Sequence, residues 1–164
     1  FSPSTSIDSF SSLRFTWNKN DELVRILEAA RDHPQWLTHS VYSRPNNGTQ
    51  LFFARKDGTY FKADGYEWGR RKDRRLMRED HMKLKVNKVD VIAANYAHSA
   101  VLPSFHRRVY WLISNPEIVF VHYLKSETED EEEGGVNAYK IADSLGRNGL
   151  HLSLQQLKEQ LQPI

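Results

Sequence analysis

The chain has 164 residues, of which 39% are apolar, and its formal net charge is +2. This length allows one domain with a buried core, and the apolar fraction argues against disorder through most of the chain. The absence of cysteine excludes disulfides, thiolate-bound zinc and a cysteine nucleophile, and no run reaches the roughly 18 apolar residues of a membrane span.

The N-terminal part predicts a leader and a helix. Residues 1–12 are rich in Ser and predict a disordered leader, so we place a single domain at residues 13–164. A helix is expected to begin at Asn20, a good N-cap, because acidic residues follow it in the first turn. It should end before Pro34. Its apolar positions recur at helical spacing, at Leu23, Ile26, Leu27 and Ala30.

The next part of the chain shows strand and turn signals. Residues 51–54 predict a strand, which a turn at residues 57–58 joins to residues 59–61 as a hairpin. Residues 76–84 mix charged residues with Leu and Met, and from this pattern we expect a short helix.

Three better strands and a second helix follow. Residues 89–97, 105–113 and 117–124 are rich in β-branched and aromatic residues. Residues 127–135 are acidic, end in two glycines and predict a flexible loop. Leucines at helical spacing after Ser153, a possible cap, predict the helix. The expected fold class is therefore α+β, a mainly antiparallel β-sheet with flanking N-terminal and C-terminal helices.

Several long strings carry a resemblance to one family. They are Trp-Gly-Arg-Arg-Lys-Asp at 68–73, Arg-Glu-Asp-His-Met-Lys-Leu-Lys-Val at 78–86, Tyr-Ala-His-Ser at 96–99 and Phe-His-Arg-Arg at 105–108. Through them the chain resembles the CG-one DNA-binding domain of the calmodulin-binding transcription activators, of the animal type, over roughly residues 17–125. The resemblance implies sequence-specific binding of double-stranded DNA at CGCG-type promoter elements in the nucleus, with no enzymatic activity and no cofactor. It also implies that calmodulin binds only through regions outside this chain.

The basic segment supplies the candidate DNA-binding residues. Residues 55–88 hold twelve Lys and Arg against six Asp and Glu, whereas residues 125–164 hold four against eight. Segregated positive charge favours a polyanionic partner, and the arginine fork matches both phosphate oxygens and the guanine edge. The candidates are Lys56, Arg70, Arg71, Lys72, Arg74, Arg75, His81, Lys83, Lys85 and Arg108.

These candidates also have purely structural alternatives. A basic run such as residues 70–75 is often only a solvated surface. If residues 78–83 are helical, their first turn is placed to hold a phosphate on free backbone amides, but Glu79 and Lys83 then also form an ordinary i,i+4 pair.

Two adjacent arginines in a predicted strand need a separate choice. Arg107 and Arg108 point to opposite faces, because side chains alternate along a strand. We favour Arg108, on the side of His106 and Tyr110, as the DNA contact. The alternative is an arginine that partners a buried acid or stacks on a core ring.

Other functions stay open at this point. Binding of RNA or single strands is one, because aromatic residues that stack on bases or pack in the core interleave with the basic ones, at Tyr60, Phe61, Tyr66 and Trp68. A metal site is another, at His81, His98, His106 and His122, although no His-x-x-x-His pair occurs. Residues 79–81, Glu-Asp-His, are compatible with a metal-dependent nuclease. An interaction domain without nucleic acid is the last.

Overall fold

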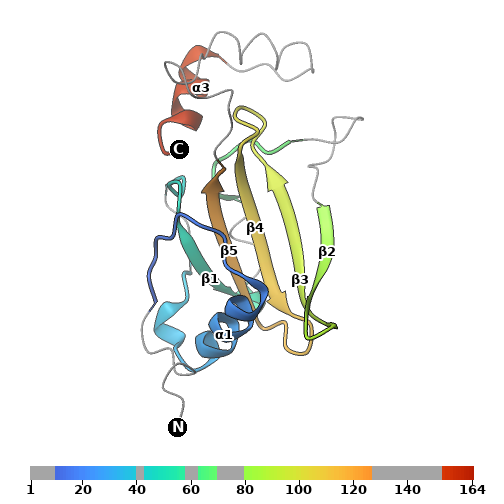
Figure 1. Ribbon diagram of the computed structural model, residues 1–164. Coiled ribbons are helices and arrows are strands. Elements are labelled where there is room, and N and C mark those ends of the chain that lie inside the picture. Colours follow the sequence, from blue (N-terminus) through green and yellow to red (C-terminus); the bar gives the residue numbers. More distant parts are fainter. Residues whose placement is uncertain (1–9, 40–42, 58–62, 70–79, 127–152) are drawn as a thin grey trace.

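The computed structural model describes residues 10–39, 43–57, 63–69, 80–126 and 153–164. Within these residues the chain forms a five-stranded antiparallel sheet with a helix near each end of the sequence, which confirms the α+β prediction (Figure 1). The elements are α1 (Asn20–Arg31), η2 (Pro34–Trp36), β1 (Gln50–Ala54), η3 (Arg55–Asp57), β2 (Asp80–Val86), β3 (Val89–His98), β4 (Phe105–Leu112), β5 (Ile118–Lys125) and α3 (Leu154–Leu161).

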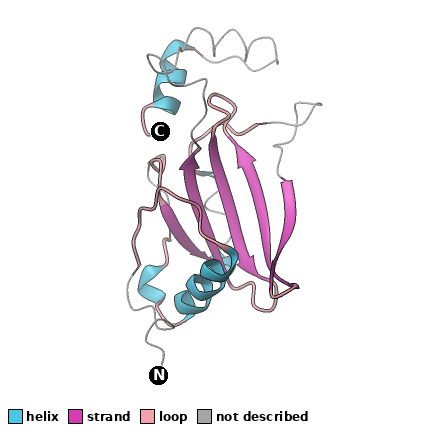
Figure 2. Cartoon of the chain, in the orientation of Figure 1, coloured by secondary structure: helices cyan, strands magenta, loops and turns pink. Residues whose placement is uncertain are grey.

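The sheet is a meander with one added strand. Its order is β1-β5-β4-β3-β2, so β2 to β5 are neighbours in sequence order and β1 pairs with the outer side of β5 (Figure 2). Val86 pairs with Val89, which leaves a two-residue turn at Asn87 and Lys88, with φ of 52° and 67°. Positive φ at both positions is the geometry that matches the twist of a two-residue hairpin.

One face of the sheet, the helix face, is covered by α1 (Figure 1). Leu23, Leu27 and Ala30 of α1 are each 1% exposed and lie in one apolar cluster with sheet residues of every second position. The sheet contributes Phe52, Ile92, Ala94, Tyr110 and Phe120 to this cluster. The helical spacing seen in the sequence therefore marks the side of α1 that packs on the sheet, and α1 ends before Pro34 as predicted.

The opposite face, the strip face, is covered by irregular chain and by α3. We call residues 64–69 the strip. Its aromatic side chains Tyr66 and Trp68 are buried with Phe105 and Tyr123 of the sheet, and α3 packs against the same cluster. Of the two roles that the sequence left open for these aromatics, Tyr66 and Trp68 therefore have packing in the core.

The predicted short helix at residues 76–84 is wrong over its described part, because residues from Asp80 onward form β2. Met82 and Leu84 are half-buried on the helix face, while His81, Lys83 and Lys85, which alternate with them, are exposed. This alternation is the period of two of a strand with one solvated side. Lys83 therefore lies in a strand and not in the helical turn considered from the sequence.

Two helix starts and the leader differ in their outcomes. Asn20 is not the cap of α1: it lies inside the helix, and its side chain donates to Lys85 O at 2.9 Å. Ser153 caps α3 as predicted, accepting from the Gln156 N–H at 3.1 Å. Phe10, placed in the leader, packs its ring 4.6 Å from that of Phe52.

Some predictions fall on other parts of the chain. The rest of the leader at 1–9, the hairpin partner at 59–61 and the acidic loop at 127–135 lie outside the described residues. Among the helices that the structure describes, none is long and apolar enough to cross a membrane.

Candidate nucleic-acid interface

The densest predicted cluster lies between two anchored points of the sheet. Residues 70–79, with Arg70, Arg71, Lys72, Arg74 and Arg75, are outside the described residues, but both flanking residues are placed. Gly69 donates its N–H to His98 O at 2.8 Å, and Asp80 pairs with Tyr96. The basic segment therefore leaves and rejoins the sheet beside the same end of β3.

A row of cationic side chains continues from this point along β2. His81, Lys83 and Lys85 are exposed and alternate with Met82 and Leu84, so all three point to the strip-face side. Successive members are about 6.7 Å apart along the strand. His81 Nδ1 lies 2.6 Å from the Asn95 side-chain oxygen, which orients its ring. The structure thus brings His81 and Lys83 together on this side of β2, and Lys85 follows beyond an irregularity in the strand pairing between Leu84 and Lys85.

A further cation on the same face is Arg55, which was not among the candidate residues. Its guanidinium lies 4.7 Å over the Trp111 ring, and its Nε donates to Pro116 O at 2.6 Å. Lys83 pairs with Ala93, which in turn pairs with Trp111, so the small Ala93 separates Arg55 from Lys83. Lys56 follows, exposed in η3. The only sequence signal was an Arg-Lys pair directly after a strand.

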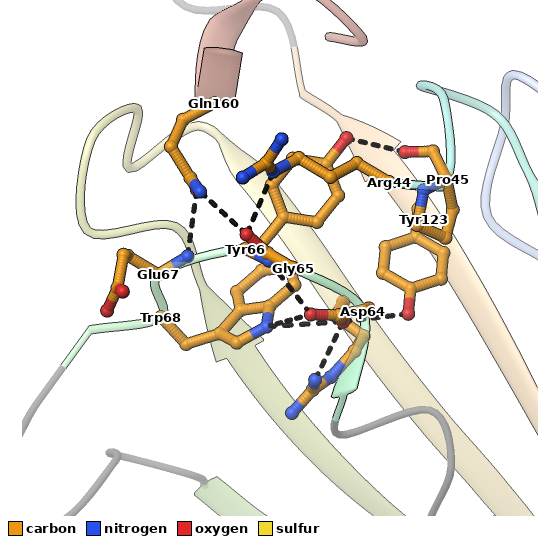
Figure 3. A network of polar contacts seen from close by, with 10 residues as sticks. Arg44, Pro45, Asp64, Gly65, Tyr66, Glu67, Trp68, Tyr123 and Gln160 are labelled. Atoms are coloured by element: carbon orange, nitrogen blue, oxygen red, sulfur yellow. Dashed lines mark hydrogen bonds and ion pairs between the residues drawn. The ribbon is translucent and has the colours of Figure 1, made fainter. Parts of the chain in front are cut away.

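Arg107, in contrast, is an interior residue. It is 1% exposed, its Nη1 lies 2.9 Å from Asp64 Oδ2, and its guanidinium is 4.6 Å over the Trp68 ring. The Tyr123 hydroxyl donates to the same carboxylate at 2.8 Å (Figure 3). Burial, and then the negative charge of Asp64, raise the pKa of Tyr123, so its hydroxyl stays a donor. This is the buried acid partner that the sequence left open for one of the two arginines.

Arg108 points to the helix face, away from the β2 row. Its guanidinium is stacked between two rings, 3.9 Å from the centre of Trp17 and 4.3 Å from that of Tyr96. It is half-buried. The structure therefore does not bring Arg108 together with Lys83 and Lys85. Side chains alternate along a strand, and Arg108 lies on the face opposite to that of the two lysines.

The histidines of the metal hypothesis are likewise divided between the faces. His81 lies on the strip-face side, whereas His122 is buried on the helix face, where its Nε2 donates to Arg14 O at 2.8 Å. Burial lowers the pKa of His122 to about 4, and it also lowers the pKa of His106, with a further contribution from Arg108. Within the described ranges no three His, Asp or Glu side chains converge as metal ligands.

The arrangement of the described residues gives little support to single-strand binding or to a metal-dependent nuclease. Tyr66 and Trp68 are buried, so they offer no ring to a single strand, while Tyr60 and Phe61 are outside the described residues. Asp80 and His81 are consecutive in β2 and point to opposite sides, which separates two groups of the nuclease hypothesis.

Comparison with known proteins gives a consistent result. A family model described as CG-1 domain matches residues 12–126. "Calmodulin-binding transcription activator 2" of Homo sapiens is 41% identical over 152 residues, or 92% of this chain. "Calmodulin-binding transcription activator homolog 1" of Caenorhabditis elegans is 36% identical over 96% of the chain, and "Calmodulin-binding transcription activator 4" of Arabidopsis thaliana is 35% identical over 79%. The chain spans 13% of the length of each of these relatives. No solved structure matches it.

Proposed function

Because this chain belongs to the CG-1 domain family, the DNA-binding domain of the calmodulin-binding transcription activators, we propose that it binds double-stranded DNA at CGCG-type promoter elements. The family is not enzymatic, in agreement with the sequence analysis. The observation that carries the proposal is the placement of Gly69 and Asp80, the two residues that flank the segment 70–79. Both flanks of this arginine-rich segment are fixed to the end of β3, and the β2 row continues from it.

Two groups of basic residues have different roles in this function, one reading bases and the other binding phosphates. The five basic residues between Arg70 and Arg75 read guanines in the major groove, because the planar arginine fork matches guanine O6 and N7. Lys83 and Lys85 hold phosphates, for which a point charge on a flexible stem suffices. His81 lies on the same side of β2 and extends this contact, and we assign the exposed Lys56 to phosphate binding as well.

Arg108 takes a different role in the revised proposal. Its guanidinium is already held by Trp17 and Tyr96 on the helix face, so we assign it mainly to packing rather than to phosphate binding. We further propose a nuclear location and, from the relatives' names, that calmodulin binds elsewhere in a longer protein.

The decisive experiment is a competition at fixed salt between a CGCG duplex, a scrambled duplex, a single strand and RNA, each with and without EDTA. We expect the CGCG duplex to compete best and EDTA to have no effect. If five or six phosphates are neutralised, log K against log salt should fall with a slope of about −5. Preference for RNA or single strands, or loss of binding with EDTA, would overturn the proposal.

A second probe tests how bases are read. Replacing guanine by 7-deazaguanine removes the N7 acceptor and keeps base pairing, so affinity should fall. Alanine at a base-reading arginine should cost about 1 to 3 kcal/mol on the CGCG site, whereas Lys83→Ala should weaken all duplexes alike and reduce the salt slope by about one. Normal binding of the 7-deazaguanine duplex, with full sequence preference in every arginine variant, would place recognition elsewhere.

A further inference from the structure

Arg55, the first residue of η3, is an exposed cation whose side chain is held in place by two contacts. Its Nε donates to Pro116 O at 2.6 Å, and its guanidinium lies 4.7 Å from the centre of the Trp111 ring. Stacking on a tryptophan face and a hydrogen bond to a backbone carbonyl both restrict a long side chain that is otherwise among the most flexible. The guanidinium of Arg55 is therefore ordered before any ligand arrives.

The positive charge of Arg55 has no acidic counterpart among the residues that the structure places. No carboxylate there lies within ion-pair distance of its guanidinium, and Asp57, two residues further on, is paired with His39 instead. Its terminal nitrogens Nη1 and Nη2 make no hydrogen bond to the described residues either. A guanidinium has several N–H donors besides Nε, so these are available to the oxygens of an anion.

A second cation, Lys83 of β2, lies on the same face of the sheet. Lys83 pairs with Ala93, and Ala93 pairs with Trp111, so Ala93 lies between Lys83 and the stack of Arg55 on Trp111. Two strand spacings separate the backbones of β2 and β4, which places them about 10 Å apart. The side chain of Ala93 is a methyl group, so no long side chain from this position of β3 stands between the two cations.

We propose that Arg55 is a further DNA-binding residue, and that Arg55 and Lys83 together bind one phosphate of the duplex above Ala93. The inference rests on the proposed function and adds a residue to its phosphate-binding set. A phosphate group offers acceptor oxygens in more than one direction, so a planar fork and a point charge can bind it from two sides. Because Arg55 is already ordered, less side-chain entropy is lost when the phosphate binds.

Substitutions that remove charge test the shared phosphate in the whole chain. They are Arg55→Gln, Lys83→Gln and the double variant. Arg25→Gln is the matched control for net charge, because Arg25 is an exposed arginine of α1 that makes a surface pair with Asp21. For each variant the Kd is measured for a CGCG duplex and for a scrambled duplex over a range of salt, at a temperature well below the midpoint of thermal unfolding.

We expect either single variant to raise the Kd for both duplexes roughly three- to tenfold, since a phosphate contact carries no sequence information. The increase in the double variant should be clearly smaller than the product of the two single increases, because both side chains hold the same phosphate. The salt slope of the double variant should fall by about one, as for Lys83 alone, rather than by two. Arg25→Gln should leave the Kd and the slope unchanged.

Ala93→Ile is an independent probe, because it keeps both charges and fills the space between them. A β-branched side chain suits a strand, so the melting temperature should be unchanged or higher. The Kd for both duplexes should nevertheless rise roughly threefold or more, since the phosphate can no longer approach the sheet between Arg55 and Lys83.

An unchanged Kd in Arg55→Gln would overturn the inference and leave the proposed function intact, and a lower melting temperature would then assign Arg55 to the turn that contains Pro116. An equal rise in Arg25→Gln would reduce the effect to net charge and overturn the inference too. Increases that multiply in the double variant, or an unchanged Kd in Ala93→Ile, would contradict a shared phosphate. If the parent chain binds no duplex, the proposed function fails, and the role of Arg55 fails with it.

Discussion

The two faces of the sheet are closed by different kinds of structure. On the helix face, α1 satisfies its own backbone hydrogen bonds, so only apolar side chains have to meet the sheet. On the strip face, the covering chain is irregular and its polar groups need outside partners. Asp64 and Gln160 supply many of these partners. Hydrophobic packing alone can therefore hold a helix, whereas an irregular segment requires buried polar side chains at defined positions.

The largest effect should come from breaking the polar attachment. Asp64→Ala would leave Arg107 buried without its carboxylate, and Tyr123 and Trp68 without their acceptor. We expect the free energy of unfolding, measured in urea, to fall by about 4 kcal/mol. Asp57→Ala is the control, since Asp57 pairs with the exposed His39 at 3.6 Å among the described residues and its loss should cost less than about 1 kcal/mol. Equal losses in the two variants would contradict the comparison.

Breaking the apolar attachment should cost somewhat less. Leu27→Ala removes a fully buried side chain of α1, and the resulting cavity should lower the free energy of unfolding by about 3 kcal/mol. Native-state exchange at the Glu67 amide should stay slow, because the strip lies on the other face. Glu28→Ala, exposed on the same helix, should be nearly neutral. Fast exchange at Glu67 in Leu27→Ala would show that the faces are not held separately.

Acid should weaken the helix face through His122. Its folded pKa of about 4 lies below the unfolded value of 6.5, so the unfolded chain binds more protons between these values and stability falls as the pH falls through that window. From pH 7.5 to 5 this histidine alone should remove about 2 kcal/mol from the free energy of unfolding. His122→Gln retains an N–H donor and should flatten the profile by that amount. A profile identical to the parent's would rule out His122 as its source.

The smallest loss of unfolding free energy should come from substitution of Arg108, the neighbour of the buried Arg107. Arg108→Met keeps an apolar stem between Trp17 and Tyr96 and loses the cation–π contacts and a side-chain hydrogen bond to Tyr110, so we expect a loss of about 1 kcal/mol. Arg107→Met should cost several times more, because it leaves Asp64 buried without its cation. Urea unfolding measures the loss of unfolding free energy in each variant, and so compares the strip face with the helix face at two adjacent residues. A similar loss in both variants would contradict the difference between the faces.

The sequence predicted those parts of the fold that local patterns report. α1 and the three strands β3 to β5 appear within a residue or two of the expected bounds, because burial on one or both sides leaves a readable period. β2 was missed, although Met82 and Leu84 alternate with basic residues, since the window that was read as helical began at residue 76, before the strand.

The candidate site was predictable in composition but not in placement. Charge density alone singled out residues 70–75, and the alternation in β2 puts Lys83 and Lys85 on one side. The Asp64–Arg107 pair joins residues 43 apart in sequence, and the Gln160–Gly65 contact joins residues 95 apart. No local period reports such contacts, so the attachment of the strip could only come from the structure.

Those long separations bear on how the chain folds. α1 and the β4–β5 hairpin form by closing short loops. The carboxylate of Asp64, in contrast, bonds to Arg107 and Tyr123 on two later strands, and Gln160 is the most distant partner along the chain. Contacts of high sequence separation form late because loop-closure entropy is lost before they contribute. The strip face should therefore assemble after the helix face during refolding, and a chain emerging from the ribosome would complete the strip face only once α3 has been synthesised.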